Sequence, residues 1–273
     1  MYTVKDDEGK KYICHLRGRL KQRQMYPLVG DWVLFSPEEK VIEEIKARDN
    51  RLLRPPVANI DQVMIVASLT SPEPDWSLVN RQLIAVEQVG LAVYICLNKI
   101  DLINPRCREK VDGMLRGFPY SYYFISAALE INLEKIIKLL TGRCTVFAGP
   151  SGVGKSTLLN AIQPDLRLKT GDISGKLKLG RHTTRSVELL SLKVGGMVVD
   201  TPGFSRLDLP DLKPEQLAAC FPEFDLLAQR CFFRNCLHLA EPGCAVREAA
   251  DQGKVNHLRY KHYHLFLKEL ISS

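Results

Sequence analysis

The segment Gly149–Ser156, with the sequence GPSGVGKS, is the feature that most constrains the fold of this chain. Four residues separate its first glycine from Gly-Lys-Ser, and it stands between the apolar run 145–148 and the helix-favouring stretch 157–162. The glycines let the backbone curl so that N–H groups face phosphate oxygens, and the following helix adds the positive end of its dipole. This pattern predicts a phosphate-binding loop in which Lys155 reaches the β- and γ-phosphates and the Ser156 hydroxyl binds Mg²⁺.

Apolar runs alternate with helical patterns around this loop. Four continuous runs are typical of strands buried on both faces of a parallel sheet, and they cover residues 63–67, 91–97, 145–148 and 197–199. Between them, residues 76–86 repeat apolar side chains every three or four positions after a capping Asp75. Residues 133–140 do the same before Gly142. Strands that alternate with helices predict an α/β domain with a mostly parallel sheet.

The sequence Asn98-Lys99-Ile100-Asp101 follows the second of these runs and predicts selectivity for a nucleotide base. A carboxylate at Asp101 can accept hydrogen bonds from both N1–H and N2–H₂ of guanine, whereas adenine lacks this pair of donors. Asn98 would brace the loop, and Lys99 would cover the face of the base. Alone, the motif is also compatible with a polar strand-to-helix turn, but beside a phosphate-binding loop it indicates GTP.

Three shorter signals extend this predicted nucleotide site. Ser126 and Ala127 follow the run 122–125 and fit a loop that offers backbone N–H groups to the guanine oxygen. Asp200, at the end of a predicted strand, can hold Mg²⁺ through water, and the Gly203 N–H can meet the γ-phosphate. Without a phosphate-binding loop in the same chain, the signal at Asp200 and Gly203 would equally predict a turn that closes a strand.

The segment 180–185, with the sequence GRHTTR, predicts a loop that closes on the γ-phosphate. We expect Thr184, rather than Thr183, to bind Mg²⁺ there. Phe204 stands where many GTPases place a glutamine that orients the attacking water, and a phenyl ring cannot orient water by hydrogen bonding. His182 is our candidate for assisting hydrolysis, although a lone histidine is more often structural. The predicted catalytic residues are therefore His182, Thr184 and Lys155.

The order of these motifs along the chain is unusual. Ordinary GTPases place the phosphate-binding loop before the Asn-Lys-x-Asp motif, whereas here Asn98–Asp101 precedes Gly149. Chain ends can be moved without changing which strands are neighbours, if the original termini lie close together. We therefore predict a circularly permuted GTPase domain. The segment after Gly203 then runs directly into the C-terminal region, so hydrolysis is expected to move that region.

Cysteine and histidine side chains cluster near the C-terminus. Three thiolates and one imidazole suit tetrahedral Zn²⁺ and leave no open position for chemistry, which predicts one structural zinc ion. The ligand set is Cys231, Cys236, His238 and Cys244. A unit as small as 206–273 needs a cross-link such as this metal site to fold stably. We interpret the other cysteines as scattered core residues, namely Cys14, Cys96, Cys107, Cys144 and Cys220.

Composition and charge narrow the choice of compartment and partner. No apolar run approaches the about 20 residues that span a bilayer, and the N-terminus lacks an apolar signal core, so we expect a cytoplasmic protein without a membrane partner. The formal net charge of +7 permits a polyanionic partner. Residues 10–23 hold six Lys and Arg without an acid, within a stretch of short alternating runs that predicts a small β-barrel. Residues 254–264 mix basic and aromatic groups, which predicts either an RNA-binding face or a terminal helix with a polar face.

The combined order NKID, SAA, GPSGVGKS, HTT and DTPGF, followed by C-x₄-C-x-H-x₅-C, resembles the ribosome small subunit-dependent GTPase A family over nearly the whole chain. The resemblance implies an OB-fold RNA-binding domain at 1–58, a circularly permuted GTPase domain at 59–205 and an α-helical zinc-binding domain at 206–273. It implies ribosome-stimulated GTP hydrolysis during late maturation of the 30S subunit, with that subunit and its 16S rRNA as partners. We expect a monomer.

Residue assignments follow the motifs. Mg²⁺ is assigned to Ser156, Thr184 and Asp200. GTP is assigned to Asn98, Lys99, Asp101, Ser126, Ala127, Gly149, Pro150, Ser151, Gly152, Val153, Gly154, Lys155, Ser156, Thr157, Asp200 and Gly203. Two rival functions stay open from the residues alone. A guanylate-type nucleotide kinase explains 149–157 but none of the other motifs, and an RNA-binding module would hold GTP only as a structural ligand.

Overall fold

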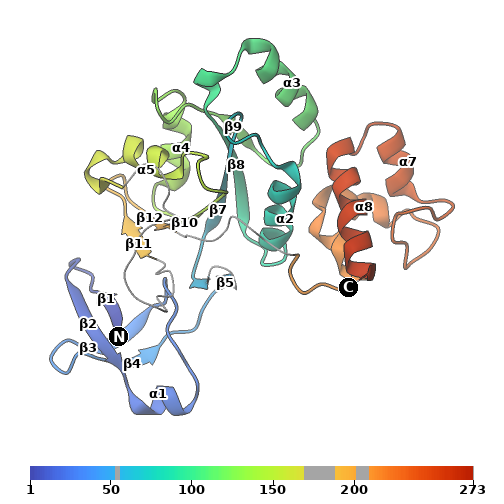
Figure 1. Ribbon diagram of the computed structural model, residues 1–273. Helices are drawn as coiled ribbons and strands as arrows, with labels where there is room; N and C mark the ends of the chain where they lie inside the picture. Colours follow the sequence, from blue (N-terminus) through green and yellow to red (C-terminus); the bar gives the residue numbers. More distant parts are fainter. Residues whose placement is uncertain (53–55, 169–187, 201–208, 273) are drawn as a thin grey trace.

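The structure, a computed structural model, describes residues 1–52, 56–168, 188–200 and 209–272 and contains three units in chain order (Figure 1). A small sheet at the N-terminus is followed by a central α/β unit and then by a helical unit that lies beside helix α2. The predicted multi-domain α/β class is confirmed. Among the described residues, no helix is long and apolar enough to cross a bilayer.

The N-terminal unit is a half-barrel sheet of four short strands in the order β1-β2-β4-β3. The strands are β1 (Tyr2–Lys5), β2 (Lys11–Leu16), β3 (Val33–Ser36) and β4 (Val41–Ile45), with helix α1 (Gly18–Gln22) after β2. Cys14 and Ile42 are fully buried at the centre of its small core. A two-stranded ribbon, β5 (Arg51–Leu52) and β6 (Val57–Ala58), leads toward the central unit.

The central sheet has six strands in the order β11-β12-β10-β7-β8-β9. They are β7 (Gln62–Ser68), β8 (Ala92–Asn98), β9 (Tyr122–Phe124), β10 (Cys144–Ala148), β11 (Glu188–Ser191) and β12 (Met197–Asp200). All neighbouring pairs are parallel except β11 and β12. The sheet is therefore mostly parallel, as predicted, and its middle strand β7 is buried along its whole length.

Helices cover both faces of this sheet (Figure 1). Helices α2 (Trp76–Glu87) and α3 (Pro105–Leu115) pack on one face, and α4 (Leu133–Leu140) and α5 (Lys155–Ile162) pack on the other. The Asp75 carboxylate accepts the Leu78 N–H at 2.9 Å and caps α2, as its sequence predicts. Short 3-10 helices follow β8 (Ile100–Leu102) and α5 (Pro164–Leu166).

The C-terminal unit is a helical cluster without strands among its described residues. It contains 3-10 helices Pro214–Cys220 and Pro222–Phe224 and helices α6 (Asp225–Ala228), α7 (Ala245–Asp251) and α8 (His257–Ser272). Phe221 and Phe224 stack at its core and Tyr263 meets both rings edge to face, with ring centroids 5.0 to 5.2 Å apart. Ile84 of α2 belongs to the same buried cluster, so the unit packs directly on the central domain.

A buried arginine joins the C-terminal unit to the central domain. The Arg259 guanidinium is fully buried, forms an ion pair with Glu223 at 2.7 Å and donates to the Asn80 side-chain oxygen of α2 at 2.7 Å. It also lies 4.1 Å from the centre of the Phe221 ring. Because every one of these contacts compensates for lost water, removal of any partner would leave a buried charge incompletely solvated. The interface is therefore a specific one, not a loose contact.

This packing favours one of the two alternatives for residues 254–264, the terminal helix, and it corrects the expectation for Cys107. Arg259, His262 and Tyr263 are buried, so the basic and aromatic stretch 254–264 is used largely to hold α8 in place and not as one continuous RNA-binding face. Cys107 is exposed in the first turn of α3, whereas the sequence was interpreted as placing it in the core. Asn104 accepts the Cys107 N–H at 2.9 Å, so this residue starts a surface helix.

His262 predicts a pH dependence of stability. Burial, followed by the charges of neighbouring Lys261, Arg259 and Arg81, lowers the pKa of His262 to about 4, and its Nδ1 lies 2.9 Å from the Asn80 side-chain nitrogen. An unfolded histidine has a pKa of about 6.5, so between these values the unfolded chain binds the extra proton and stability falls as the pH falls.

We expect urea unfolding to show a loss of about 1–2 kcal/mol between pH 7 and pH 5 that is absent from His262→Gln. The matched control is His257→Gln, which removes an exposed histidine of the same helix and should keep the wild-type slope. Equal slopes in wild type and His262→Gln would contradict the assignment.

Candidate functional site

The segment 149–154 forms a tight loop between β10 and α5. Gly149, Gly152 and Gly154 all have positive φ, at 135°, 80° and 95°. A Cβ atom at Gly149 would lie 2.2 Å from the Val66 carbonyl oxygen, and one at Gly154 would lie 2.3 Å from the Asn98 side-chain nitrogen. Glycine is therefore required twice over, by conformation and by space, and the loop curls as the sequence predicts.

Asn98 joins this loop to two others. Its side-chain nitrogen donates to the Val153 carbonyl at 2.8 Å, while its oxygen accepts the Lys99 N–H at 2.8 Å and the Ala127 N–H at 2.9 Å. The side chain is buried, so each of these bonds replaces water that is no longer available. One residue thus fixes the Asn-Lys-x-Asp loop, the phosphate-binding loop and the Ser-Ala-Ala loop in one place.

Lys99 and Asp101 lie on the loop that begins at Asn98. One Asp101 carboxylate oxygen is buried and has no hydrogen-bond partner in the described part of the chain. A buried acceptor without a donor is costly, so this oxygen fits a ligand that brings an N–H group. The Lys99 Nζ donates to the Ser71 carbonyl at 2.5 Å, which fixes the lysine stem beside the loop after β7. No sequence signal identified Ser71, because its contribution is a backbone oxygen.

Lys155 and the Ser-Ala-Ala loop are also held by backbone contacts. The Lys155 Nζ donates to the carbonyls of Gly149 and Pro150 at 2.7 and 2.8 Å, so the ammonium lies at the rim of the loop. Ser126 is fully buried, and its hydroxyl accepts the Leu129 N–H at 3.1 Å. The Ala127 N–H, expected to serve a guanine oxygen, donates to Asn98 instead, so a base would have to share that donor.

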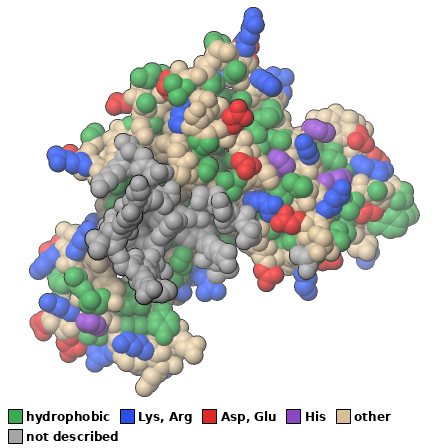
Figure 2. Space-filling model, in the orientation of Figure 1, with side chains coloured by type: hydrophobic (Ala, Val, Ile, Leu, Met, Phe, Trp, Pro, Cys, Tyr) green, Lys and Arg blue, Asp and Glu red, His purple; other side chains and the backbone are tan. Residues whose placement is uncertain are grey.

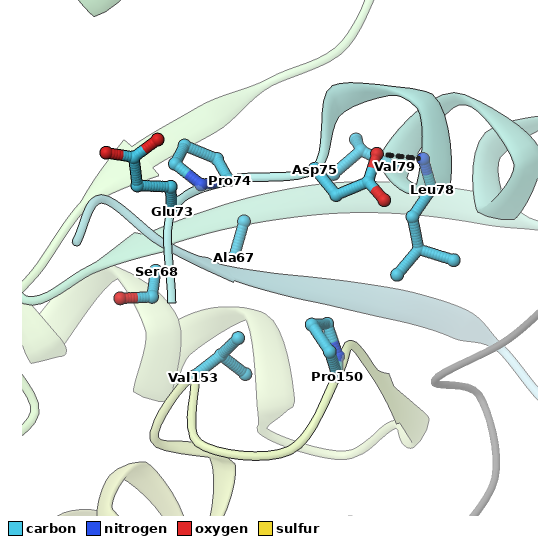
Figure 3. A pocket seen from close by; sticks show the side chains of 9 residues that line it. All are labelled: Ala67, Ser68, Glu73, Pro74, Asp75, Leu78, Val79, Pro150 and Val153. Carbon is cyan, nitrogen blue, oxygen red and sulfur yellow. Dashed lines mark hydrogen bonds between the residues drawn. The ribbon is translucent and has the colours of Figure 1, made fainter. Parts of the chain in front are cut away.

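A small cavity lies between the phosphate-binding loop and the start of α2 (Figure 3). Pro150 and Val153 line it on the loop side, and Ala67 and Val79 line it on the side of β7 and α2. The Asp75 carboxylate at its rim already caps α2. The Ser68 hydroxyl donates to the Thr70 carbonyl, and the Glu73 and Asp75 carboxylates would repel a phosphate, so we do not assign this cavity to a nucleotide.

The remaining predicted nucleotide residues are less completely described. The backbone of β12 ends at Asp200, and β12 runs parallel to β10, so its carboxyl end lies at the same sheet edge as the phosphate-binding loop. The Asp200 side chain lies outside the described residues. Five further residues named from the sequence also lie outside the described residues. They are His182, Thr183, Thr184, Gly203 and Phe204.

Cys231, Cys236, His238 and Cys244 form a second site. Their sulfur and ring-nitrogen atoms all lie within 4.8 Å of one another, and the His238 Nδ1 lies 3.6 Å from the Cys231 sulfur and 3.5 Å from that of Cys244. Tetrahedral zinc with usual bond lengths would separate such atoms by about 3.6 Å, so the donor set fits that ion. Burial and nearby thiols raise the pKa of Cys236 to about 12, an effect that a divalent cation would reverse.

Local hydrogen bonds hold the loop of this cluster in shape. The Glu241 carboxylate accepts the N–H groups of Leu237, Leu239 and Ala240 at 2.7 to 3.1 Å. The Tyr260 hydroxyl of α8 donates to the His238 carbonyl at 2.9 Å. The ligand loop is therefore anchored to α8, which itself packs on the central unit.

The Asn98 contacts generate a stability prediction. Asn98→Ala would leave the Val153 carbonyl and two N–H groups without their buried partner, so we expect a loss of about 2–4 kcal/mol in the free energy of unfolding, measured with urea. The matched control is Asn104→Ala, which removes an exposed helix cap worth about 1 kcal/mol. Equal losses in the two variants would show that Asn98 does not join the loops.

Comparison with known proteins gives one consistent result. The RsgA GTPase family model matches residues 45–210, and the RsgA N-terminal domain model matches residues 1–42. A Geobacillus sp. (strain WCH70) protein named small ribosomal subunit biogenesis GTPase RsgA is 44% identical over 269 residues, which cover 96% of this chain and 92% of that protein. The Moorella thermoacetica protein of the same name is 45% identical over 270 residues, covering 98% of this chain and 93% of that protein.

Solved structures agree with the sequence relatives. YjeQ from Thermotoga maritima superposes with a TM-score of 0.86 at 36% identity, covering 99% of this chain and 94% of that one. YloQ, described as a circularly permuted GTPase, superposes with a TM-score of 0.80 at 36% identity, covering 99% and 91%. The motif order, the sheet order and these matches together show that the chain belongs to the RsgA GTPase family.

Proposed function

We propose that this protein hydrolyses GTP to GDP and phosphate and acts in the biogenesis of the small ribosomal subunit. The observation that carries the proposal is the Asn98 side chain, which joins a base-selecting loop to a phosphate-binding loop. A single nucleotide can then contact Asp101 with its base and Lys155 with its phosphates. The names of the relatives supply the small ribosomal subunit as the partner.

In the proposed site, the loop Gly149–Thr157 surrounds the phosphates with backbone N–H groups, and Asp101 accepts the two guanine donors. Lys99 covers the base, and the loop of Ser126 and Ala127 lies at its oxygen. Mg²⁺, where bound, neutralises phosphate charge and would be held by Ser156, Thr184 and Asp200. The N–H of Gly203 meets the γ-phosphate.

Hydrolysis in this proposal needs a water molecule placed in line with the γ-phosphate. Lys155 stabilises the charge that develops on the phosphate oxygens, and Thr184 closes the loop over them. His182 orients the attacking water, because Phe204 cannot. Residues after Gly203 lead into the C-terminal unit, so loss of the γ-phosphate would be transmitted to that unit.

The other assignments complete the proposal. The unit boundaries are 1–58, 59–205 and 206–273, with the first unit contacting 16S rRNA through its basic stretch. The Cys₃His cluster holds one structural Zn²⁺. The protein works as a cytoplasmic monomer on the 30S subunit.

The decisive experiment measures GTP turnover with and without purified 30S subunits. We expect slow intrinsic turnover and an increase of about tenfold or more with 30S but not with 50S subunits, since groups supplied in trans are worth about 10³–10⁵ in kcat for other GTPases. Phosphoryl transfer to GMP is expected to be absent. Turnover that 30S leaves unchanged would contradict the proposal, and transfer to GMP would replace it with a kinase.

Asp101→Asn tests base recognition. An amide cannot accept both guanine donors, but it can donate to the carbonyl that xanthine carries in place of the amino group. We expect GDP affinity to fall by at least about 100-fold and xanthosine diphosphate to become the better ligand, measured by calorimetry. A parallel loss of both ligands would mean that Asp101 supports the fold and not the base.

Removal of the metal tests the Cys₃His cluster. A strong chelator should unfold the C-terminal unit, because its small core depends on the ion that the four ligands would share, while the central unit still binds a fluorescent GDP analogue. Cys231→Ser should reproduce this loss, and Cys107→Ser, which changes an exposed cysteine outside the cluster, should not. Retention of the full circular dichroism signal in chelator would contradict the assignment.

A further inference from the structure

The segment between the first two ligands of the Cys₃His cluster, residues 232–235, is here named the knuckle loop. All four of its residues are exposed, and Phe232 and Phe233 are 79% and 40% exposed as whole residues. The two rings contact each other edge to face, with centroids 4.9 Å apart. Exposed aromatic pairs are costly in water, and the C-terminal unit has a core in which phenyl rings are otherwise buried, so this pair marks a contact surface.

The knuckle loop has a defined backbone. The Phe232 N–H donates to the Gly243 carbonyl at 3.0 Å, and the Cys236 N–H donates to the Phe233 carbonyl at 3.3 Å. Gly243 has a φ of +67°, and a Cβ atom there would lie 3.0 Å from the Phe232 Cβ, so the chain segments at Phe232 and Gly243 approach closely. The backbone that carries the two rings is thus held in shape before any partner arrives, which lowers the entropy cost of binding.

The charged side chains of the knuckle loop and of the residue before Cys231 are basic. Arg230 and Arg234 are exposed, and neither forms an ion pair with an acid in the part of the chain that the structure describes. The stretch 226–240 contains no Asp or Glu. The acid that follows, Glu241, is engaged by three backbone N–H groups of its own loop. Figure 2 shows hydrophobic, basic and acidic side chains interspersed on the visible face of the C-terminal unit.

We propose that the knuckle loop, with Arg230, binds unpaired bases of RNA. An exposed ring offers a stacking face to a single base, and two free guanidinium groups reach the flanking phosphates. Duplex RNA buries its base faces, and an apolar peptide segment would favour a groove over two projecting rings flanked by cations. The inference rests on the proposed function, because the small ribosomal subunit is where such RNA would be met.

The test measures binding of the full-length protein to a fluorescein-labelled 12-nucleotide single-stranded RNA and to the same RNA as a duplex. We expect preference for the single strand, and a loss of about tenfold or more in Phe232→Ala/Phe233→Ala, since base stacking is worth about 1–3 kcal/mol per base. Phe232→Trp should retain binding. Arg230→Gln/Arg234→Gln should lower the slope of log affinity against log salt by about 1.4.

Matched controls separate this surface from general effects. Leu265→Ala removes an exposed apolar side chain of α8, and Lys110→Gln/Lys135→Gln removes two exposed charges of the central unit. Leu265→Ala should bind the single strand more tightly than Phe232→Ala/Phe233→Ala, and Lys110→Gln/Lys135→Gln more tightly than Arg230→Gln/Arg234→Gln. Every variant should keep its bound metal and its melting temperature. Equal binding by wild type and Phe232→Ala/Phe233→Ala, or equal binding of duplex, would overturn the proposal.

Co-sedimentation with 30S subunits distinguishes a failure of the knuckle-loop proposal from a failure of the proposed function. If 30S subunits stimulate wild-type turnover while the phenylalanine variant binds them normally, only the knuckle-loop proposal fails. Loss of 30S binding with unchanged RNA binding would replace RNA by a ribosomal protein as the partner. If 30S subunits neither bind nor stimulate the wild type, the proposed function fails and this inference fails with it.

Discussion

The buried side chain of Asn98 is the contact on which the candidate nucleotide site depends. It bonds to the loop after β10, to its own loop after β8 and to the loop after β9. These loops leave the carboxyl ends of parallel strands, where α/β sheets place their ligands. Strand β7 lies between β10 and β8, and its Val66 carbonyl leaves room for no side chain at Gly149. The strand that carries no motif thereby shapes the phosphate-binding loop.

Strand order in space, and not chain order, makes this geometry possible. β8 and β9 precede β10 in sequence, yet the sheet places them on the far side of β7 from β12. The same permutation leaves the C-terminal unit as a continuation of the chain after β12. That unit returns to the central domain through Arg259 and Asn80, and the N-terminal sheet contacts β11 through Lys5 and Ser191 at 2.8 Å. Both flanking units therefore contact the central domain on elements that precede its motifs. Helix α2 comes before β8, which ends at Asn98, and β11 comes before β12, which ends at Asp200.

The sequence predicted those features whose cause is local. Glycine spacing predicted the loop at 149–154, Asp75 predicted the start of α2, and ligand spacing predicted that four metal-binding side chains would converge. Helix α3 was missed because it is mostly exposed and has little apolar periodicity, although Asn104 followed by Pro105 was a start signal.

Features that depend on distant partners were not predictable from the pattern. The burial of Arg259 requires Asn80, which is 179 positions away, and Glu223, so its sequence neighbourhood could suggest only a basic helix. Ser71 and Val153 contribute backbone oxygens, which carry no residue signature. The positions of His182 and Thr184 stay predictions.

A crystal structure of the protein with Mg²⁺ and a non-hydrolysable GTP analogue tests the central claim most directly. The expected result is one nucleotide whose guanine N1 and N2 donate to the Asp101 carboxylate and whose phosphates contact the Lys155 Nζ. A nucleotide that contacts only one of these two side chains, with the other directed to a separate cleft, would contradict the permuted single-site arrangement.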